Sequence, residues 1–282
     1  MNIFNILEEI EKADPDFHDR INPRRAAIKN ITNFGSKIAV TALPFAMRTI
    51  FQKAYGQTLP QSVTNILNFA LKLEFLESAF YTQGLAAKSL VPTGGDTTAI
   101  TTMSTQKKAH VVFLQTTLGS SAILQTTQGT NGTYDFTAGG LFPTVFTNYD
   151  TFLAVANGFE DTGVRAYKGQ VPGLIGNQTV LTAALSIHSV EARHAATIRQ
   201  LRSLRPAGPA TIKPWITGAN DTGNANLFNN YVGEDNVIQD NITITSLNAL
   251  NGTVAVNTAT EAFDEPLTLA QVLSLVAPFG VK

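Results

Sequence analysis

The chain has 282 residues and a formal net charge of −1, so it offers no excess of basic residues for binding nucleic acid. It contains no cysteine, which excludes disulfides, thiolate zinc sites, iron–sulfur clusters and cysteine nucleophiles. No uninterrupted apolar run approaches the roughly 20 residues that a membrane-spanning helix needs. We therefore expect no nucleic-acid partner and no membrane span, and any metal ligands must be nitrogen or oxygen atoms.

The first 60 residues combine a charged, helical lead-in with a segment similar to an export signal. Arg24 and Arg25, followed by Lys29 and the apolar run 38–47, resemble a twin-arginine signal. This pattern predicts export to the periplasm or out of the cell. In the alternative interpretation the arginines lie on the solvent face of an ordinary amphipathic helix, and the protein is cytoplasmic.

Apolar residues recur at helical spacing in four segments after residue 60. The predicted helices cover residues 61–88, 103–126, 148–167 and 178–204. Near the end of the fourth segment, Arg199, Arg202 and Arg205 suit the negative end of the helix dipole. Asp150 and Asp161, in the third segment, are expected to cap the helix or to face solvent.

The lengths of the connections predict how these helices are arranged. The first and third connections are short, so each joins an antiparallel pair. The second has about 20 residues, which can span up to about 65 Å when extended. A helix of about 24 residues is only about 36 Å long. The second connection can therefore return along the whole bundle, which predicts an all-α fold, the ferritin-like variant of the four-helix bundle with one long crossover.

Residues 205–282 are rich in Gly, Asn and Thr and read as a small irregular cap on the bundle. Two alternating runs around Asn251 and Gly252 predict a β-hairpin, and residues 265–279 predict one last short helix. The sequence thus divides into a lead-in over residues 1–60, a bundle over 61–204 and a C-terminal cap over 205–282.

Ionisable side chains lie near the middle of the apolar side of each predicted helix. Residues at mid-height of antiparallel helices share one level, so these side chains can converge. Burying several carboxylates together is costly unless cations or protons compensate, and a metal pair is the usual solution. The side chains, in chain order, are Glu74, Glu77, His110, Glu160, Glu191 and His194.

Two tyrosines repeat the spacing of two of these glutamates. Tyr81 follows Glu74 by seven residues, and Tyr167 follows Glu160 by seven. Seven residues make about two helical turns, so each tyrosine lies on the face of its glutamate. Each is expected to bond a ligand carboxylate from another helix, as residues around a metal site commonly do.

The di-metal recipe for a bundle is one Glu from each of two helices and Glu-x-x-His from each of the other two. Glutamate oxygens together with imidazole suit iron or manganese. The second helix departs from the recipe, because Lys107 stands three residues before His110. Its ammonium is expected to lie among the carboxylates and to replace the charge of one metal ion. Glu77 is either a surface residue in an ion pair or a substitute ligand one turn from Glu74.

Five blocks of sequence together resemble the ferritin-like domain proteins related to plant desiccation-associated proteins. These blocks, spread over about residues 61–282, are "LNFALKLEFLESAFYTQGL", "KKAHVVFLQTTLG", "GFEDTGVRAYKG", "SVEARHAATIRQL" and "EAFDEPLTLAQVLSLVAPF", in which "FDEPLT" is the most specific. The paired arginines are similar to those of bacterial members with twin-arginine signals. The resemblance implies an exported bundle with a di-iron or di-manganese centre whose metal-type residues fall on Glu74, His110, Glu160, Glu191 and His194. Lys107 departs from the family pattern, which has Glu at that position.

Two hypotheses about function follow, and the sequence leaves open whether the protein is an enzyme. In the first, an exported bundle binds one or two Fe or Mn ions and, if redox-active, acts on a small oxidant such as peroxide or oxygen. Glu191 would then be the bridging ligand, and His110 and His194 the terminal ones. In the second, Lys107 replaces metal in a non-catalytic structural or stress-associated bundle with an assembly or surface role. Either protein could form a homo-oligomer.

Overall fold

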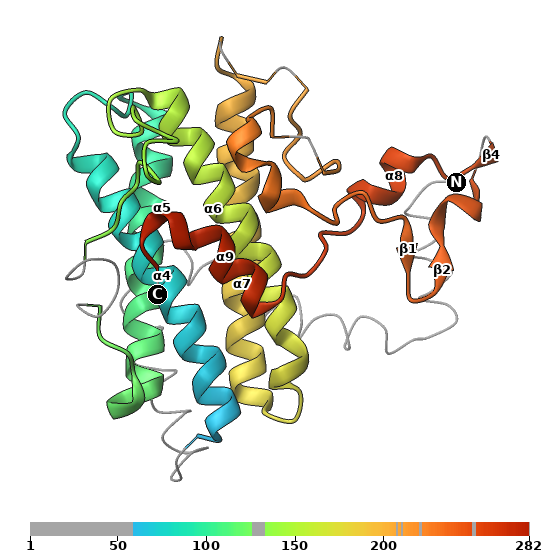
Figure 1. The fold of residues 1–282 in the computed structure, drawn as a ribbon, viewed down its shortest axis with the longest axis horizontal. Helices are drawn as coiled ribbons and strands as arrows, with labels where there is room; N and C mark the ends of the chain where they lie inside the picture. Colours follow the sequence, from blue (N-terminus) through green and yellow to red (C-terminus); the bar gives the residue numbers. More distant parts are fainter. Residues whose placement is uncertain are drawn as a thin grey trace, which may run out of the picture. The chain divides into compact units, whose positions relative to one another are not determined.

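The computed structural model describes residues 59–125 and 133–281, apart from positions 207, 210, 220, 221, 250 and 251. The twin-arginine segment therefore lies outside the described residues. Within them, four long helices pack in two pairs to form a bundle, α4 with α5 and α6 with α7 (Figure 1). Their bounds are Gln61–Ala86 for α4, Gly95–Leu118 for α5, Tyr149–Gln170 for α6 and Gln178–Ser203 for α7. The predicted all-α bundle is confirmed.

Both ends of α5 lie eight residues before their predicted positions, and the helix begins at Gly95 rather than at residue 103. From the sequence, the Thr-rich stretch before residue 103 is predicted to form a turn, since β-branched residues are weak helix formers. Here the hydroxyls of Thr98 and Thr102 donate to backbone carbonyls one turn earlier, and buried Ile100 anchors the same stretch to the core. The helix ends at Leu118 instead of residue 126, because Gly119 takes a positive φ of 56°.

The helices after the crossover begin where capping chemistry places them. The side chain of Asn148 accepts a hydrogen bond from the amide of Thr151 at the start of α6, and Asn177 accepts one from Val180 at the start of α7. A cluster of phenylalanine rings joins the crossover to the bundle core. Its members are Phe80, Phe136, Phe146, Phe152 and Phe159.

Among the described residues of the C-terminal region the secondary structure is short. The strands are β1 (Ile238–Gln239), β2 (Ile242–Thr243), β3 (Asn248–Ala249) and β4 (Gly252–Thr253), and the helices are α8 (Val256–Glu261) and α9 (Leu269–Val276). The predicted hairpin is β3–β4, but Gly252 pairs with Ala249 and lies in the strand rather than in the turn. The sequence analysis missed β1–β2, whose turn residues Asp240 and Asn241 both have positive φ, as a type I′ turn requires. The predicted last helix is α9, which packs against α6 (Figure 1).

A buried polar layer between α6, α7 and the C-terminal region corrects the predicted role of Asp161. Asp161 is 2% exposed instead of facing solvent, and Arg199, near the end of α7, is 0% exposed. An Arg199 Nη atom donates to Asp161 Oδ2 over 2.6 Å, and the hydroxyl of Tyr231 donates to the same oxygen over 2.6 Å. Arg202 is also buried and donates to Asn157.

A second set of contacts fastens the C-terminal segment to α6. Arg165 Nε lies 2.7 Å from Glu234 Oε1, and the guanidinium also donates to the carbonyl of Val232. The amide of Leu267 donates in turn to the carbonyl of Arg165. Gly169 permits this close approach, because a Cβ at that position would lie 2.0 Å from the carbonyl oxygen of Leu267.

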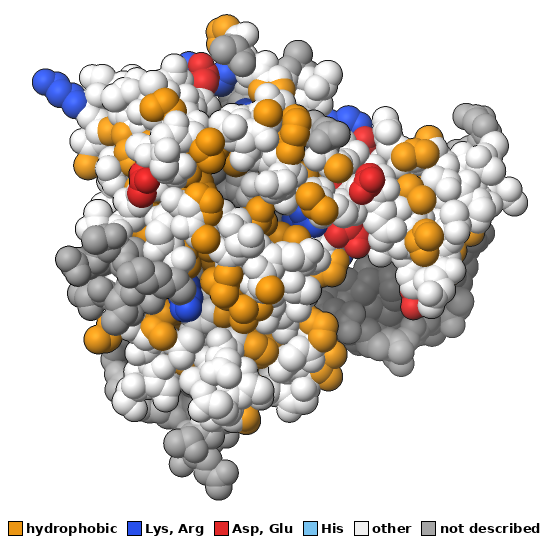
Figure 2. Space-filling model, viewed as in Figure 1, with side chains coloured by type: hydrophobic (Ala, Val, Ile, Leu, Met, Phe, Trp, Pro, Cys, Tyr) orange, Lys and Arg blue, Asp and Glu red, His pale blue; other side chains and the backbone are white. Residues whose placement is uncertain are grey.

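The surface agrees with the low charge content. On the face shown in Figure 2, charged side chains are few and scattered among uncharged polar ones. Among the described residues no helix is both long and apolar enough to cross a membrane.

We predict that Asp161→Ala lowers the free energy of unfolding by about 3–5 kcal/mol, because it leaves the buried guanidinium of Arg199 without its carboxylate. Urea denaturation measures the change. Asp150→Ala is the matched control, since its ion pair with Arg205 is about one third exposed and is expected to contribute about 0–1 kcal/mol. Equal losses in the two variants would contradict this account of the layer.

Candidate metal centre

The predicted site residues all lie at one level of the bundle, each on the helix expected for it. The bundle brings together Glu74, Glu77 and Tyr81 from α4, Lys107 and His110 from α5, Glu160 and Tyr167 from α6, and Glu191 and His194 from α7. Apart from His110, which is half-buried, all of these residues are buried. The arrangement is two groups of donor atoms that share Glu191.

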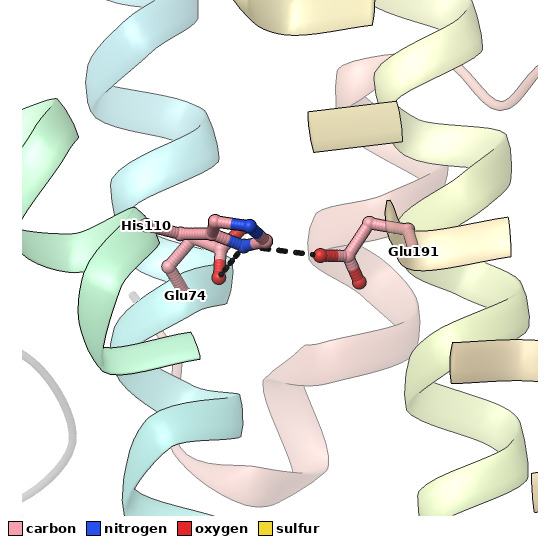
Figure 3. Close-up of side chains that lie close together, drawn as sticks. All are labelled: Glu74, His110 and Glu191. Carbon is pink, nitrogen blue, oxygen red and sulfur yellow. Dashed lines mark hydrogen bonds and ion pairs between the residues drawn. The ribbon is translucent and has the colours of Figure 1, made fainter. Parts of the chain in front are cut away.

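The first cluster consists of Glu74, His110 and Glu191 (Figure 3). His110 Nδ1 lies 3.2 Å from Glu74 Oε2 and 3.3 Å from Glu191 Oε1. Two donors at about 2.1 Å from one ion, seen from it at roughly 90–110°, lie about 3.0–3.4 Å apart. His110 Nδ1 therefore lies at ligand-like spacing from both carboxylate oxygens, and the three atoms, from three different helices, are within 4.8 Å of one another.

The second cluster consists of Glu160, Glu191 and His194. His194 Nδ1 lies 3.3 Å from Glu160 Oε2. Gln106, which the sequence analysis missed, places its amide oxygen 2.6 Å from His194 Nε2. Because that oxygen accepts only, Nε2 donates a hydrogen bond to it, and Nδ1 faces the carboxylate of Glu160. A proton on Nδ1 or a cation satisfies this second contact.

Three buried polar atoms of the two clusters make no hydrogen bond of good geometry among the described residues, although each lies 3.0–3.3 Å from an atom of Lys107, His110, Glu160 or His194. They are Glu160 Oε2, Glu191 Oε1 and His194 Nδ1. Buried polar atoms in proteins are almost always hydrogen-bonded, so each exception calls for an explanation, such as an ion. The donor set thus fits a metal ion that binds through oxygen and nitrogen.

Lys107 lies among the carboxylates, as its position three residues before His110 predicts. Its Nζ contacts Glu77 Oε2 at 2.5 Å, Glu160 Oε2 at 3.0 Å and also Glu191 Oε2. Lys107 thus bridges glutamates from the other three helices. Glu77 is buried and paired with Lys107, so the interpretation of Glu77 as a surface residue is wrong.

Each tyrosine bonds a glutamate on the opposite pair of helices, as the seven-residue spacing predicts. The hydroxyl of Tyr81 donates to Glu160 Oε1 over 2.6 Å, and that of Tyr167 donates to Glu74 Oε1 over 2.8 Å. Burial raises the pKa of both tyrosines well above the ordinary value, so both are neutral donors. The two hydroxyls fix the orientation of the two carboxylates.

The charges of the centre shift the pKa values of its members in opposite directions. Burial by itself lowers the pKa of Lys107, but Glu160, Glu191 and Glu77 outweigh burial and raise it well above the ordinary value. Burial by itself lowers the pKa of His110. Glu74 and Glu191 outweigh burial and raise the pKa to about 9. Burial is also the main reason that the pKa of Glu77 is raised, although Lys107 opposes it. In the absence of a metal, Lys107 and His110 are therefore cations among the carboxylates of the centre.

With this geometry in view, comparison with known proteins identifies the class of protein. The profile of the ferritin-like domain matches residues 62–204, which are the four long helices. The chain belongs to the ferritin-like domain family. Comparison with curated proteins and with solved structures gives no match.

We predict that Lys107→Met destabilises the metal-free protein by about 3–5 kcal/mol, because three buried glutamates lose their common cation. Urea denaturation in the presence of a chelator measures the loss. Lys108→Met is the control, since the neighbouring lysine is exposed. A loss no larger than that of the control would show that the ammonium does not hold the carboxylates together.

The raised pKa of His110 predicts how the stability of the metal-free protein depends on pH. The folded state holds the imidazole proton more tightly than the unfolded state does, so this contribution is complete below about pH 6.5 and is lost as pH rises through about 9. Denaturation curves between pH 6 and pH 10 should show the decline. His110→Gln should remove that part of the decline, and an unchanged slope would exclude His110 as its source.

Proposed function

We propose that this chain is a ferritin-like protein that holds one divalent iron or manganese ion between Glu74, His110 and Glu191. The observation that carries the proposal is the spacing of the three donor atoms of the first cluster, with 3.2 Å and 3.3 Å between His110 Nδ1 and the two carboxylate oxygens. None of these three atoms is among those that contact the ammonium of Lys107.

The donor types support the choice of metal. Two carboxylates and one imidazole, with no sulfur atom among the three donors, suit iron or manganese better than a soft metal. Such an ion, when bound, supplies redox chemistry towards a small oxidant such as oxygen or peroxide. The surrounding residues bind and orient it: Tyr167 holds Glu74, and Lys107 holds the second oxygen of Glu191.

The charge of the centre supports one ion rather than two. Once His110 has lost its proton to bind an ion, four carboxylates and the Lys107 ammonium give −4 + 1 = −3 for the protein groups of the centre. One divalent ion brings this to −1, which a proton on Glu77 can neutralise. Two divalent ions would give +1, and they would lie beside a buried ammonium, where repulsion is strong.

The second candidate function is that of a non-catalytic structural or stress-associated bundle. The observation in its favour is that Lys107 already pairs with three glutamates, so part of the buried charge is compensated without any metal. Export, assembly into a homo-oligomer and a small oxidant as partner remain predictions of the sequence under both candidates.

We predict about one Fe or Mn ion per chain in protein prepared without chelator. Glu191→Ala should lose it, because this residue supplies one of the three donors, and Asp235→Ala, which removes an exposed carboxylate, should keep it. Elemental analysis of the purified protein measures the content. Metal-free native protein whose melting temperature does not change on addition of Fe, Mn or chelator would contradict the first candidate and favour the second.

Because His110 must lose its proton to bind the ion, the affinity for Mn should rise with pH up to about 9. The same preparation, titrated with Mn at several pH values, shows this trend.

A further inference from the structure

The two helix pairs repeat one another around the centre. Glu74 on α4 corresponds to Glu160 on α6, and each is followed seven residues later by a tyrosine that bonds the other. His110 on α5 corresponds in the same way to His194 on α7. Each histidine has Nδ1 close to the glutamate of its own pair, at 3.2 Å from Glu74 and 3.3 Å from Glu160 respectively.

The repeat is broken at two places. Three residues before the histidine, α5 has Lys107 where α7 has Glu191, and three residues after the first glutamate, α4 has Glu77 where α6 has Gly163. The unmatched residues are in contact, because Lys107 Nζ lies 2.5 Å from Glu77 Oε2.

Gly163 lies against both carboxylates. A Cβ at this position would lie 3.3 Å from Glu191 Oε2, which is tighter than most contacts of a real Cβ, and 3.4 Å from Glu77 Oε1. The two differences between the halves therefore meet at the centre, where Glu77 lies beside Lys107.

The contacts of Glu191 show that the ammonium of Lys107 occupies the position of a second metal ion. Its Oε1 belongs to the first cluster, 3.3 Å from His110 Nδ1, and its Oε2 contacts Lys107. In a carboxylate-bridged pair of ions, about 3.5–4 Å apart, the two oxygens of the bridge bind one ion each. Lys107 Nζ thus contacts Glu191 Oε2, the oxygen that a second ion would bind. It also lies 3.0 Å from Glu160 Oε2, a donor of the second cluster.

We propose that Lys107 and Glu77 form a built-in ion pair that closes a second metal site whose other donors, Glu160, Glu191 and His194, are all still present. The pair limits the centre to one ion. The proposal rests on the proposed function for the first ion, but it makes a separate statement about the second. Removal of the ammonium and its counter-ion, with a carboxylate supplied in place of Lys107, opens the closed site.

The test is the number of Mn ions bound by the full-length double variant Lys107→Glu/Glu77→Gln, compared with the native chain. The exchange restores Glu-x-x-His on α5 and removes the carboxylate that the lysine neutralised. Equilibrium dialysis and elemental analysis give the number, and magnetic coupling in the electron paramagnetic resonance spectrum reports two ions that share Glu191. Lys108→Glu adds a carboxylate at the exposed neighbouring position and serves as the control.

We expect one ion more in the double variant than in the native chain, with a coupled spectrum, and no gain in the control. An equal number in the double variant and the native chain overturns the proposal. If the double variant does not fold, as judged by circular dichroism, the number of Mn ions is measured on the neutral variant Lys107→Gln/Glu77→Gln instead. This variant frees the same three donors and is expected to bind the additional ion more weakly. No additional ion in this variant also overturns the proposal.

The experiment separates this inference from the proposed function. A native chain with no ion and a double variant with one ion would refute the first site and still support the closed second site. A native chain with one ion and a double variant with one ion would support the first site and refute the closed second site. No ion in either protein refutes both.

Discussion

The centre of the bundle depends on one buried ammonium group. Lys107 reaches from α5 to a glutamate on each of the other three helices, and its side chain is 0% exposed. Moving such charges out of water costs several kcal/mol per ion, and only close pairing offsets the cost. The packing of the two helix pairs and the chemistry of the centre therefore depend on the same contacts. A change at Lys107 must alter both.

Glu191 divides this centre into two unlike halves. One oxygen faces His110 and Glu74, where the donor spacing fits an ion, and the other faces the ammonium. An ammonium brings one charge and fixed hydrogen bonds, whereas a metal ion brings two charges and exchangeable ligands. The half around Lys107 consequently suits stability and orientation, and the half around His110 suits metal binding. We interpret the protein as a ferritin-like bundle in which a structural cation and a metal site share one carboxylate.

Much of the bundle was predictable because helical periodicity acts locally. The spacing of Glu74 to Tyr81 and of Glu160 to Tyr167 fixes a common face, and the cross-bonds between the pairs follow from it. Other features depend on distant partners or on geometry. Asp161 is buried because Tyr231, far along the chain, bonds it, and Gln106 looks like any polar residue on a helix until it meets His194. The start of α5 was missed because threonine propensity was overridden by backbone-directed hydroxyls and a buried isoleucine.

The most direct test of one ion beside one ammonium is anomalous scattering from crystals of the manganese-loaded native protein. The account predicts a single anomalous peak between Glu74, His110 and Glu191, with density for the Lys107 side chain, but no peak, between Glu160 and Glu191. Two peaks of similar height, or Lys107 displaced from the carboxylates by a second ion, would contradict it. The absence of any peak at saturating manganese would contradict it equally.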